Sequence, residues 1–211
     1  MAFIFKIRYL FKTAMIAATL VLTLGCGDQN SFTDYETDLI GTDSTAGKMR
    51  VLTVNNPEDE TVLRKVSTYF TEEDLKSDNY KILKRRMLET VLDTTNAGVG
   101  IAAPQVGISR RLVAVQRFDK PGEPFEFYPN LNIREMSPQK RYGWEGCLSI
   151  PGKRDTVLRS EWVIVTYTDD VAFTEKTDTV SGFTAIIFQH EADHLEGILY
   201  TDRRADGNRK D

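Results

Sequence analysis

Residues 189–195 are Gln-His-Glu-Ala-Asp-His-Leu, and this stretch contains both histidines of the 211-residue chain. A helix is predicted over residues 183–195, in which His190 and His194 lie one turn apart on the same face. Two imidazoles placed in this way can bind one metal ion, and Glu191 between them can act as a base towards a water molecule that the metal activates. The pattern predicts a metal-dependent hydrolase, although the short motif alone also fits a polar surface helix.

A catalytic metal site of this type needs a third protein ligand and one open position. The chain has no third histidine, and Glu196 is too close on the same helix to complete a tetrahedron. Cys147, within Gly-Trp-Glu-Gly-Cys-Leu-Ser-Ile-Pro at residues 143–151, is the natural candidate. The alternative is a buried free cysteine that serves as a small apolar side chain.

The overall composition is that of a soluble globular protein, with 41% hydrophobic and 27% charged residues. The formal net charge is −4, so the chain lacks the excess positive charge that binds nucleic acid, and we predict no nucleic-acid partner. With only two cysteines, Cys26 and Cys147, the chain is neither a disulfide-dense scaffold nor a zinc ribbon built on four cysteines.

The first 25 residues have the pattern of an export signal. A basic segment is followed by a charge-free apolar run at residues 13–25, which is too short to cross a bilayer comfortably. The run ends at Leu24-Gly25-Cys26 and resembles a bacterial lipoprotein signal, which implies lipid attachment at Cys26 and a location in the cell envelope. A plain cleaved signal, or a cytoplasmic protein whose N-terminus is not a functional signal, remains the alternative.

The rest of the chain is predicted to contain a flexible tether (26–47), one catalytic domain (48–205) and a disordered tail (206–211). Helices are expected at 80–95 and 183–195, with a short helical turn capped by Thr71 and Asp74 and an irregular segment at 58–70. Strands are expected at 50–54, 112–116, 125–128, 161–168 and 176–180. This order predicts an α+β fold with antiparallel pairing.

Three stretches of this sequence resemble the three motifs of the peptide deformylase family. They are GVGIAAPQVG (98–107), EGCLS (145–149) and QHEADHL (189–195), in the family's order. The resemblance covers residues 49–200 and implies antiparallel β-sheets around a central late helix that carries HEADH. It also implies a metal-dependent hydrolase that removes the formyl group from the N-terminal formylmethionine of peptides and proteins.

The resemblance assigns roles to individual residues. It implies that the metal ligands are Cys147, His190 and His194, and that the catalytic residues are Glu191, Gln105 and Leu148. Glu191 serves as general acid/base, while the Gln105 side-chain amide and the Leu148 backbone N–H stabilise the oxyanion. The implied substrate-binding residues are Val99, Gly100, Arg154, Phe183, Ile186 and Ile187, of which the apolar ones could equally be core residues.

The expected cofactor is one divalent metal ion. The family suggests Fe(II), and Zn, Ni or Co also suit a donor set of one cysteine and two histidines. The expected partners are an N-formylmethionyl peptide and, through Cys26, a membrane, and the protein is expected to be a monomer. Asp193 points away from His194 around the helix and is predicted to brace the fold through an arginine such as Arg159.

Two other functions remain open at this point. One is a related exported amidase or peptidase of different specificity. The other is a non-catalytic envelope lipoprotein that binds formyl-peptides. The presence of Glu191 speaks against the second, because a protein that only binds its ligand needs no base at that position.

Overall fold

The computed structural model describes residues 32–41, 47–95 and 98–204. The predicted signal at 1–25, Cys26 and the tail at 206–211 lie outside the described residues. Within the described part of the chain, no helix has both the length and the apolar character needed to cross a membrane.

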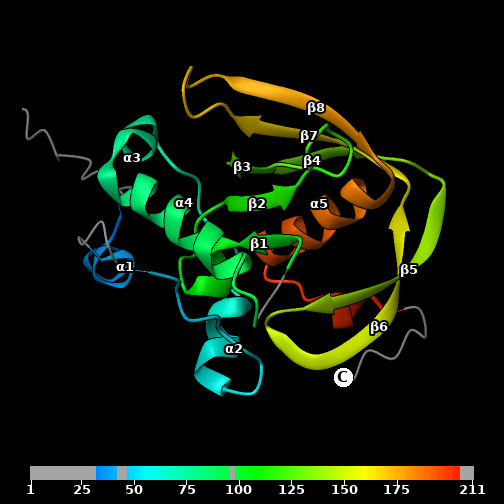
Figure 1. The fold of residues 1–211 in the computed structure, drawn as a ribbon, viewed down its shortest axis with the longest axis horizontal. Coiled ribbons are helices and arrows are strands. Elements are labelled where there is room, and N and C mark those ends of the chain that lie inside the picture. The colour runs from blue at the N-terminus through cyan, green and yellow to red at the C-terminus, as the bar shows by residue number, and fades with distance from the viewer. Residues whose placement is uncertain (1–31, 42–46, 96–97, 205–211) are drawn as a thin grey trace, which may run out of the picture.

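Helices and strands alternate irregularly along the chain (Figure 1). The helices are α1 (Asp34–Ile40), α2 (Pro57–Leu63), α3 (Glu72–Lys76), α4 (Asp78–Val91), α5 (Gly182–Leu195) and the short 3₁₀ helices η1 (Ala103–Val106) and η2 (Tyr200–Arg203). The strands are β1 (Gly100–Ala102), β2 (Leu112–Gln116), β3 (Phe125–Pro129), β4 (Asn132–Met136), β5 (Lys140–Cys147), β6 (Ile150–Ser160), β7 (Trp162–Thr168) and β8 (Glu175–Ser181).

The strands form three antiparallel sheets, β1-β2-β3, β4-β7-β8 and the hairpin β5-β6. Helix α5 contacts strands of all three sheets, and it is drawn in orange between them in Figure 1. Phe188 and Leu195 of α5 are completely buried among Val113 and Val165 of two different sheets. The predicted α+β fold with antiparallel sheets around the late helix is confirmed.

Helix α5 is held at both ends. The chain enters it through Gly182 (φ 64°) and leaves it through Gly197 (φ 68°), conformations that L side chains rarely adopt. A Cβ at Gly197 would also lie 2.3 Å from the carbonyl oxygen of Arg64, so only glycine fits there. These two turns fix where the histidine-bearing helix begins and ends in the fold.

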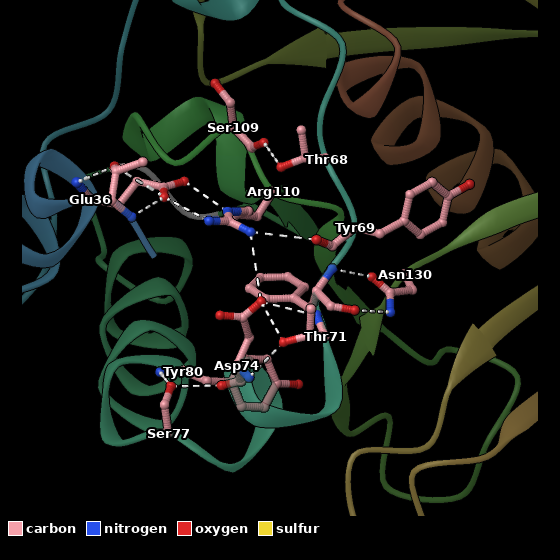
Figure 2. Close-up of polar contacts among 12 residues, drawn as sticks. Glu36, Thr68, Tyr69, Thr71, Asp74, Ser77, Tyr80, Ser109, Arg110 and Asn130 are labelled. Carbon is pink, nitrogen blue, oxygen red and sulfur yellow. Dashed lines mark hydrogen bonds and ion pairs between the residues drawn. The ribbon is translucent and has the colours of Figure 1, made fainter. Parts of the chain in front are cut away.

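The prediction of a flexible tether at 26–47 is wrong for residues 32–41, because helix α1 packs on the domain. Ile40 is completely buried, and Glu36 forms two 3.0 Å contacts with the guanidinium of Arg110 in a buried ion pair. Figure 2 shows Arg110 between Glu36 and the segment that carries Asp74. Burial opposes ionisation of Glu36, but Arg110 outweighs it and lowers the pKa of this carboxyl. The ion pair and the apolar contact hold α1 in place.

The expected irregular segment at 58–70 also needs correction, because it begins with helix α2. Asn56 accepts a hydrogen bond from Glu58 N at 2.8 Å, and Pro57 occupies the first helical position. Asn-Pro can end a strand, but an asparagine N-cap followed by proline equally starts a helix. The predicted cap at Thr71 is confirmed, since Thr71 and Asp74 form a reciprocal capping box.

Two other predicted boundaries differ from the structure. Residues 50–54 form no strand; instead, Leu52 N donates to Gln105 O and Val54 N donates to Ser149 O. Helix α4 ends at Val91 and not near residue 95, because the N–H of Gly98 turns back to the Val91 carbonyl at 3.1 Å. Strands β1, β4, β5 and β6 had no predicted ranges. Strand β1 has only three residues, and the exposed, charged residues of the other three give no clear alternation of apolar and polar positions.

Candidate metal centre

The two histidines of α5 and the cysteine at the end of β5 meet in one cluster. The ring centroids of His190 and His194 lie 5.1 Å apart, as one helical turn requires. Sγ of Cys147 lies 3.2 Å from Nε2 of His194, and the ligand atoms of all three residues lie within 4.8 Å of one another. The structure thus brings together the three residues predicted as metal ligands.

The pKa shifts in this cluster indicate an anionic Cys147 sulfur and a proton held on His190, which a metal ion must displace to bind. Burial raises the pKa of the Cys147 thiol, but His194 and His190 outweigh burial and hold it well below its ordinary value. Burial alone would lower the pKa of His190, but the Cys147 sulfur and the Glu145 carboxylate raise it well above its ordinary value. An anionic sulfur beside two imidazoles is a donor set that suits Fe(II), Zn, Co or Ni, so the residues fit a divalent metal.

A chain of buried ion pairs positions the first histidine. Nδ1 of His190 lies 2.8 Å from Glu145, which leaves Nε2 to face the cluster. Arg159 binds Glu145 at 2.7 and 3.0 Å and also binds Asp193 at 2.6 Å. Arg203 contacts the same aspartate. The predicted pairing of Asp193 with Arg159 is confirmed.

Glu145 had no predicted role in the site. Arg159 outweighs the burial of this carboxyl and lowers its pKa to about 2, so Glu145 is a permanent anion behind His190. The sequence could have indicated this role for Glu145. It precedes Cys147 by two positions, and alternate residues of a strand face the same side. Such a residue would be expected to point towards the same cluster.

Glu191 is a buried carboxyl group that lines the same cleft as Cys147 and His190. Only 3% of the residue is exposed, and its Oε2 has no hydrogen-bond partner among the described residues. Burial raises the pKa of this carboxyl to about 7. A buried carboxyl with a free oxygen and a pKa near neutrality can both accept and donate a proton.

Gly100 allows this carboxylate to lie against β1. A Cβ at Gly100 would lie 2.5 Å from Oε1 of Glu191 and 2.8 Å from Cγ2 of Ile187. Both distances are too short for real contacts, so the backbone of β1 can approach α5 this closely only at a glycine. Glycine is therefore required at this position for space and not for unusual backbone angles.

Gln105 is buried beside the cluster. Its Oε1 accepts a hydrogen bond from Ala102 N at 2.9 Å, which orients the amide. Its Nε2 points to Cys147 Sγ at 3.5 Å and to Ser149 Oγ at 3.3 Å. Leu148 follows Cys147 directly and lines the same cleft. Both predicted oxyanion-stabilising residues thus lie next to the three predicted ligand residues.

A cleft of about 470 Å³ opens over the cluster. Its lining includes all six residues predicted to bind substrate, namely Val99, Gly100, Arg154, Phe183, Ile186 and Ile187. Ile186 and Ile187 are buried and form an apolar floor, whereas Phe183 is 51% exposed at the rim. Trp144, 69% exposed, also lines the cleft and was not predicted.

The apolar cleft opens over a thiolate, two imidazoles and a carboxyl group whose pKa is close to 7. This combination is typical of a metal-dependent hydrolase, here with an α+β fold. The comparisons with known proteins narrow the class. The sequence profile of the polypeptide deformylase family matches residues 48–210. The chain belongs to the peptide deformylase family.

Curated relatives support this assignment. The peptide deformylase of Leptospira biflexa is 36% identical over 161 residues, covering 73% of this chain and 86% of that protein. The peptide deformylase of Roseiflexus sp. is 36% identical over 171 residues, covering 74% of this chain and 89% of that protein.

Solved structures agree with these relatives. The peptide deformylase of Thermotoga maritima matches with a TM-score of 0.66 at 33% identity, covering 76% of this chain and 99% of that one. A class I type b peptide deformylase from Acinetobacter baumannii, solved with Met-Ala-Ser bound, matches with a TM-score of 0.65 at 34% identity, covering 74% of this chain and 98% of that one.

The protein is therefore an enzyme that removes the formyl group from an N-terminal formylmethionine, and it is metal-dependent. The prediction of the family, the fold and the reaction is confirmed. The alternatives of an amidase with another specificity and of a non-catalytic binding protein receive no support from these relatives. Helix α1 precedes the matched residues 48–210.

Proposed function

We propose that the formyl group is cleaved at the cluster of Cys147, His190 and His194, with Glu191 moving the proton. The observation that carries this proposal is the free Oε2 of Glu191, buried beside the three ligand residues on a carboxyl of pKa about 7. When bound by these residues, the metal ion supplies Lewis-acid activation of a water molecule and of the formyl carbonyl. Glu191 takes the proton from the water and returns it to the departing amine.

The oxyanion formed by attack on the carbonyl needs hydrogen-bond donors already in position. The side-chain amide of Gln105 is such a donor, because the bond from Ala102 N to its Oε1 directs its NH₂ group towards Cys147. The backbone N–H of Leu148 is proposed as the second donor, as the resemblance implied. Both groups stabilise charge that develops only during the reaction.

The substrate chain is proposed to bind as an added strand. Within its sheet, β1 pairs only with β2, so its other edge is available for pairing along Gly100. The methionine side chain packs on the apolar surface formed by Ile186 and Ile187, near Val99 and Phe183. Arg154 contacts the peptide backbone. The Acinetobacter baumannii relative with Met-Ala-Ser bound is consistent with such a peptide complex.

A Glu191→Gln variant tests these roles. Turnover of formyl-Met-Ala-Ser should fall by about 10²- to 10⁴-fold, because general acid/base catalysis is lost, while the metal content stays at one ion per chain. Glu73→Gln, at an exposed position on α3, is the matched control and should keep full activity. Normal turnover by Glu191→Gln would contradict the proposed mechanism.

We further propose that the resident metal is Fe(II), with zinc, nickel and cobalt as the other ions that suit the donor set. Metal analysis of protein purified without oxygen, combined with turnover per bound ion, tests this. Activity that follows zinc or nickel content, with no iron present, would contradict it.

We also propose that the enzyme is a monomeric, lipid-anchored protein of a bacterial cell envelope, attached through Cys26, and that it acts on exported or scavenged formyl-peptides. The export pattern of residues 1–26 supports this. Fractionation of cells that produce the wild type and Cys26→Ala tests the location, and a wild type found only in the cytosol would contradict it. Arrest of cytosolic deformylation on gene deletion would contradict the proposed substrate pool.

A further inference from the structure

Helix α1 contacts the chain segment that directly follows η1. This segment, residues 107–111, joins η1 to β2 and is called the η1–β2 connection below. Glu36 and Leu39 are three positions apart on α1 and therefore share a face. Leu39 packs on Gly107, at the start of the connection. Glu36 binds Arg110, near its end. Helix α1 thus contacts the connection at two points.

The contact at Gly107 is tight. A Cβ at this position would lie 2.7 Å from Cδ2 of Leu39, so the leucine takes up the space that any other residue would need. Gly107 also has φ 88°, a conformation that L side chains rarely adopt. Ile40, the next residue of α1, is completely buried in the apolar cluster that contains Val106 and Ile108. Helix α1 and the end of η1 therefore pack directly on each other.

The contact at Arg110 is a buried ion pair. Figure 2 shows Arg110 between Glu36 of α1 and Asp74 of α3. The guanidinium lies 3.0 Å from each oxygen of Glu36 and 3.7 Å from Asp74. On the preceding residue, Ser109 O accepts hydrogen bonds from N and Oγ1 of Thr68 at 2.9 and 3.3 Å. The connection is therefore held by α1 together with the segment that leads into α3.

Helix α1 is itself fixed to α4. Arg86 of α4 donates hydrogen bonds to the carbonyl oxygens of Leu39 and Ile40 at 3.1 and 2.5 Å, at the end of α1 where carbonyls lack partners within the helix. Asn79 of α4 donates to Oγ1 of Thr37 at 3.1 Å. These bonds set the position of α1, so its contacts with the connection are made from a fixed support.

The turn of η1 transmits this position to Gln105. Gly107 N donates to Pro104 O at 3.1 Å. Ile108 N donates to Ala103 O, also at 3.1 Å. Gln105 lies inside the short turn that these two bonds close. A displacement of Gly107 therefore displaces the backbone of Gln105.

The side chain of Gln105 depends on accurate placement. Its Nε2 lies 3.5 Å from Cys147 Sγ and 3.3 Å from Ser149 Oγ. A group that stabilises charge in a transition state must lie within about 0.5 Å of its productive position. A misplacement of about 1 Å costs about 10²-fold in rate. A small shift of η1 is therefore enough to lower the rate.

We propose that helix α1 positions Gln105 for catalysis, with Leu39 and Glu36 as positioning residues that act through the η1–β2 connection. The proposal rests on the oxyanion role of Gln105 proposed above. Helix α1 precedes residues 48–210, which match the family profile, so this support comes from outside the matched part of the chain.

The first test measures deformylation of formyl-Met-Ala-Ser by the metal-loaded full chain. Leu39→Ala should lower kcat about three- to tenfold and change KM less than twofold, because the oxyanion donor acts in the transition state. Leu39→Met keeps an apolar side chain of similar volume and should restore kcat to within twofold of wild type. Tyr35→Ala, at a position on α1 that is 65% exposed, is the matched control and should keep full kcat.

The second test separates positioning from a general loss of stability. Gln105→Ala should by itself lower kcat about 10²- to 10³-fold, because one oxyanion donor is lost. In the Gln105→Ala background, Leu39→Ala should then cause no further fall in kcat, since the group that it positions is absent. A purely structural effect would lower kcat by the same factor in both backgrounds. Glu36→Gln should behave as Leu39→Ala does, and it takes its place in the cycle if Leu39→Ala does not fold.

The proposal is overturned if Leu39→Ala keeps the wild-type kcat, or if kcat falls equally with and without Gln105. A loss of kcat in Tyr35→Ala equal to that in Leu39→Ala also overturns it. Wild-type kcat in Gln105→Ala would instead refute the oxyanion role itself, and the positioning role with it, so the two failures are distinguishable.

Discussion

Replacing Gly100 by alanine should lower the activity by displacing the carboxylate of Glu191, the proposed general acid/base. The added Cβ would lie 2.5 Å from Oε1 of Glu191 and 3.0 Å from Cδ, whereas ordinary contact begins at about 3.4 Å. Glu191 is buried, and Ile187 is crowded at the same time, so the carboxylate must move by about 1 Å. A displacement of this size at a reacting group costs about 10²-fold in rate.

The assay is deformylation of formyl-Met-Ala-Ser by Gly100→Ala, with metal content and thermal unfolding measured in parallel. The loss should fall mainly on kcat, because the displaced group acts in the transition state. Gly143→Ala is the matched control, since its Cβ would meet only Ile186 at 3.8 Å. A folded, metal-loaded Gly100→Ala enzyme with kcat/KM within threefold of wild type would refute the reasoning, as would an equal loss in Gly143→Ala.

Other predictions concern the ligands and the docked helix. Glu145→Gln removes the anion behind His190 and should weaken metal binding about 10- to 100-fold, measured by chelator competition; unchanged affinity would contradict this. Glu36→Gln removes the nearer of the two carboxylates that face Arg110, while Asp74 remains, and should cost about 2 kcal/mol in denaturant unfolding at pH 7. The lowered pKa of Glu36 means that this difference is full above the ordinary value of 4.5 and shrinks as pH falls below it; a difference that is independent of pH would exclude the ion pair as its source. Removing the metal should abolish turnover and expose the Cys147 thiolate to iodoacetamide at neutral pH. Mass spectrometry should show that added metal protects Cys147 from labelling. Equal labelling with and without metal would exclude Cys147 as a ligand.

Much of the site could be predicted because its residue types are scarce. The chain has two histidines, and both lie one turn apart on a helix whose limits follow from local sequence. With no third histidine, Cys147 was the natural remaining ligand. Strand β2 and helix α5 were predicted almost to the residue, because apolar runs and flanking glycines mark them locally.

Other elements were missed because their cause lies elsewhere in the fold. Helix α1 has a polar sequence typical of a tether, and it is ordered by Arg110, which is 74 positions away from Glu36. Strands β5 and β6 carry many exposed polar residues, and they form because they pair with each other. Helix α2 was missed for a local reason, since Asn56-Pro57 can either end a strand or start a helix.

The sequence by itself determined the family and predicted the donor set and the general acid/base, because these depend on which residues occur and at what spacing. Only the tertiary structure decided that Glu145 fixes His190, that Gly100 makes room for Glu191 and that Trp144 borders the cleft. Each of these depends on distances between atoms of separate segments, and the physical reason is that close packing, not chain order, sets such distances.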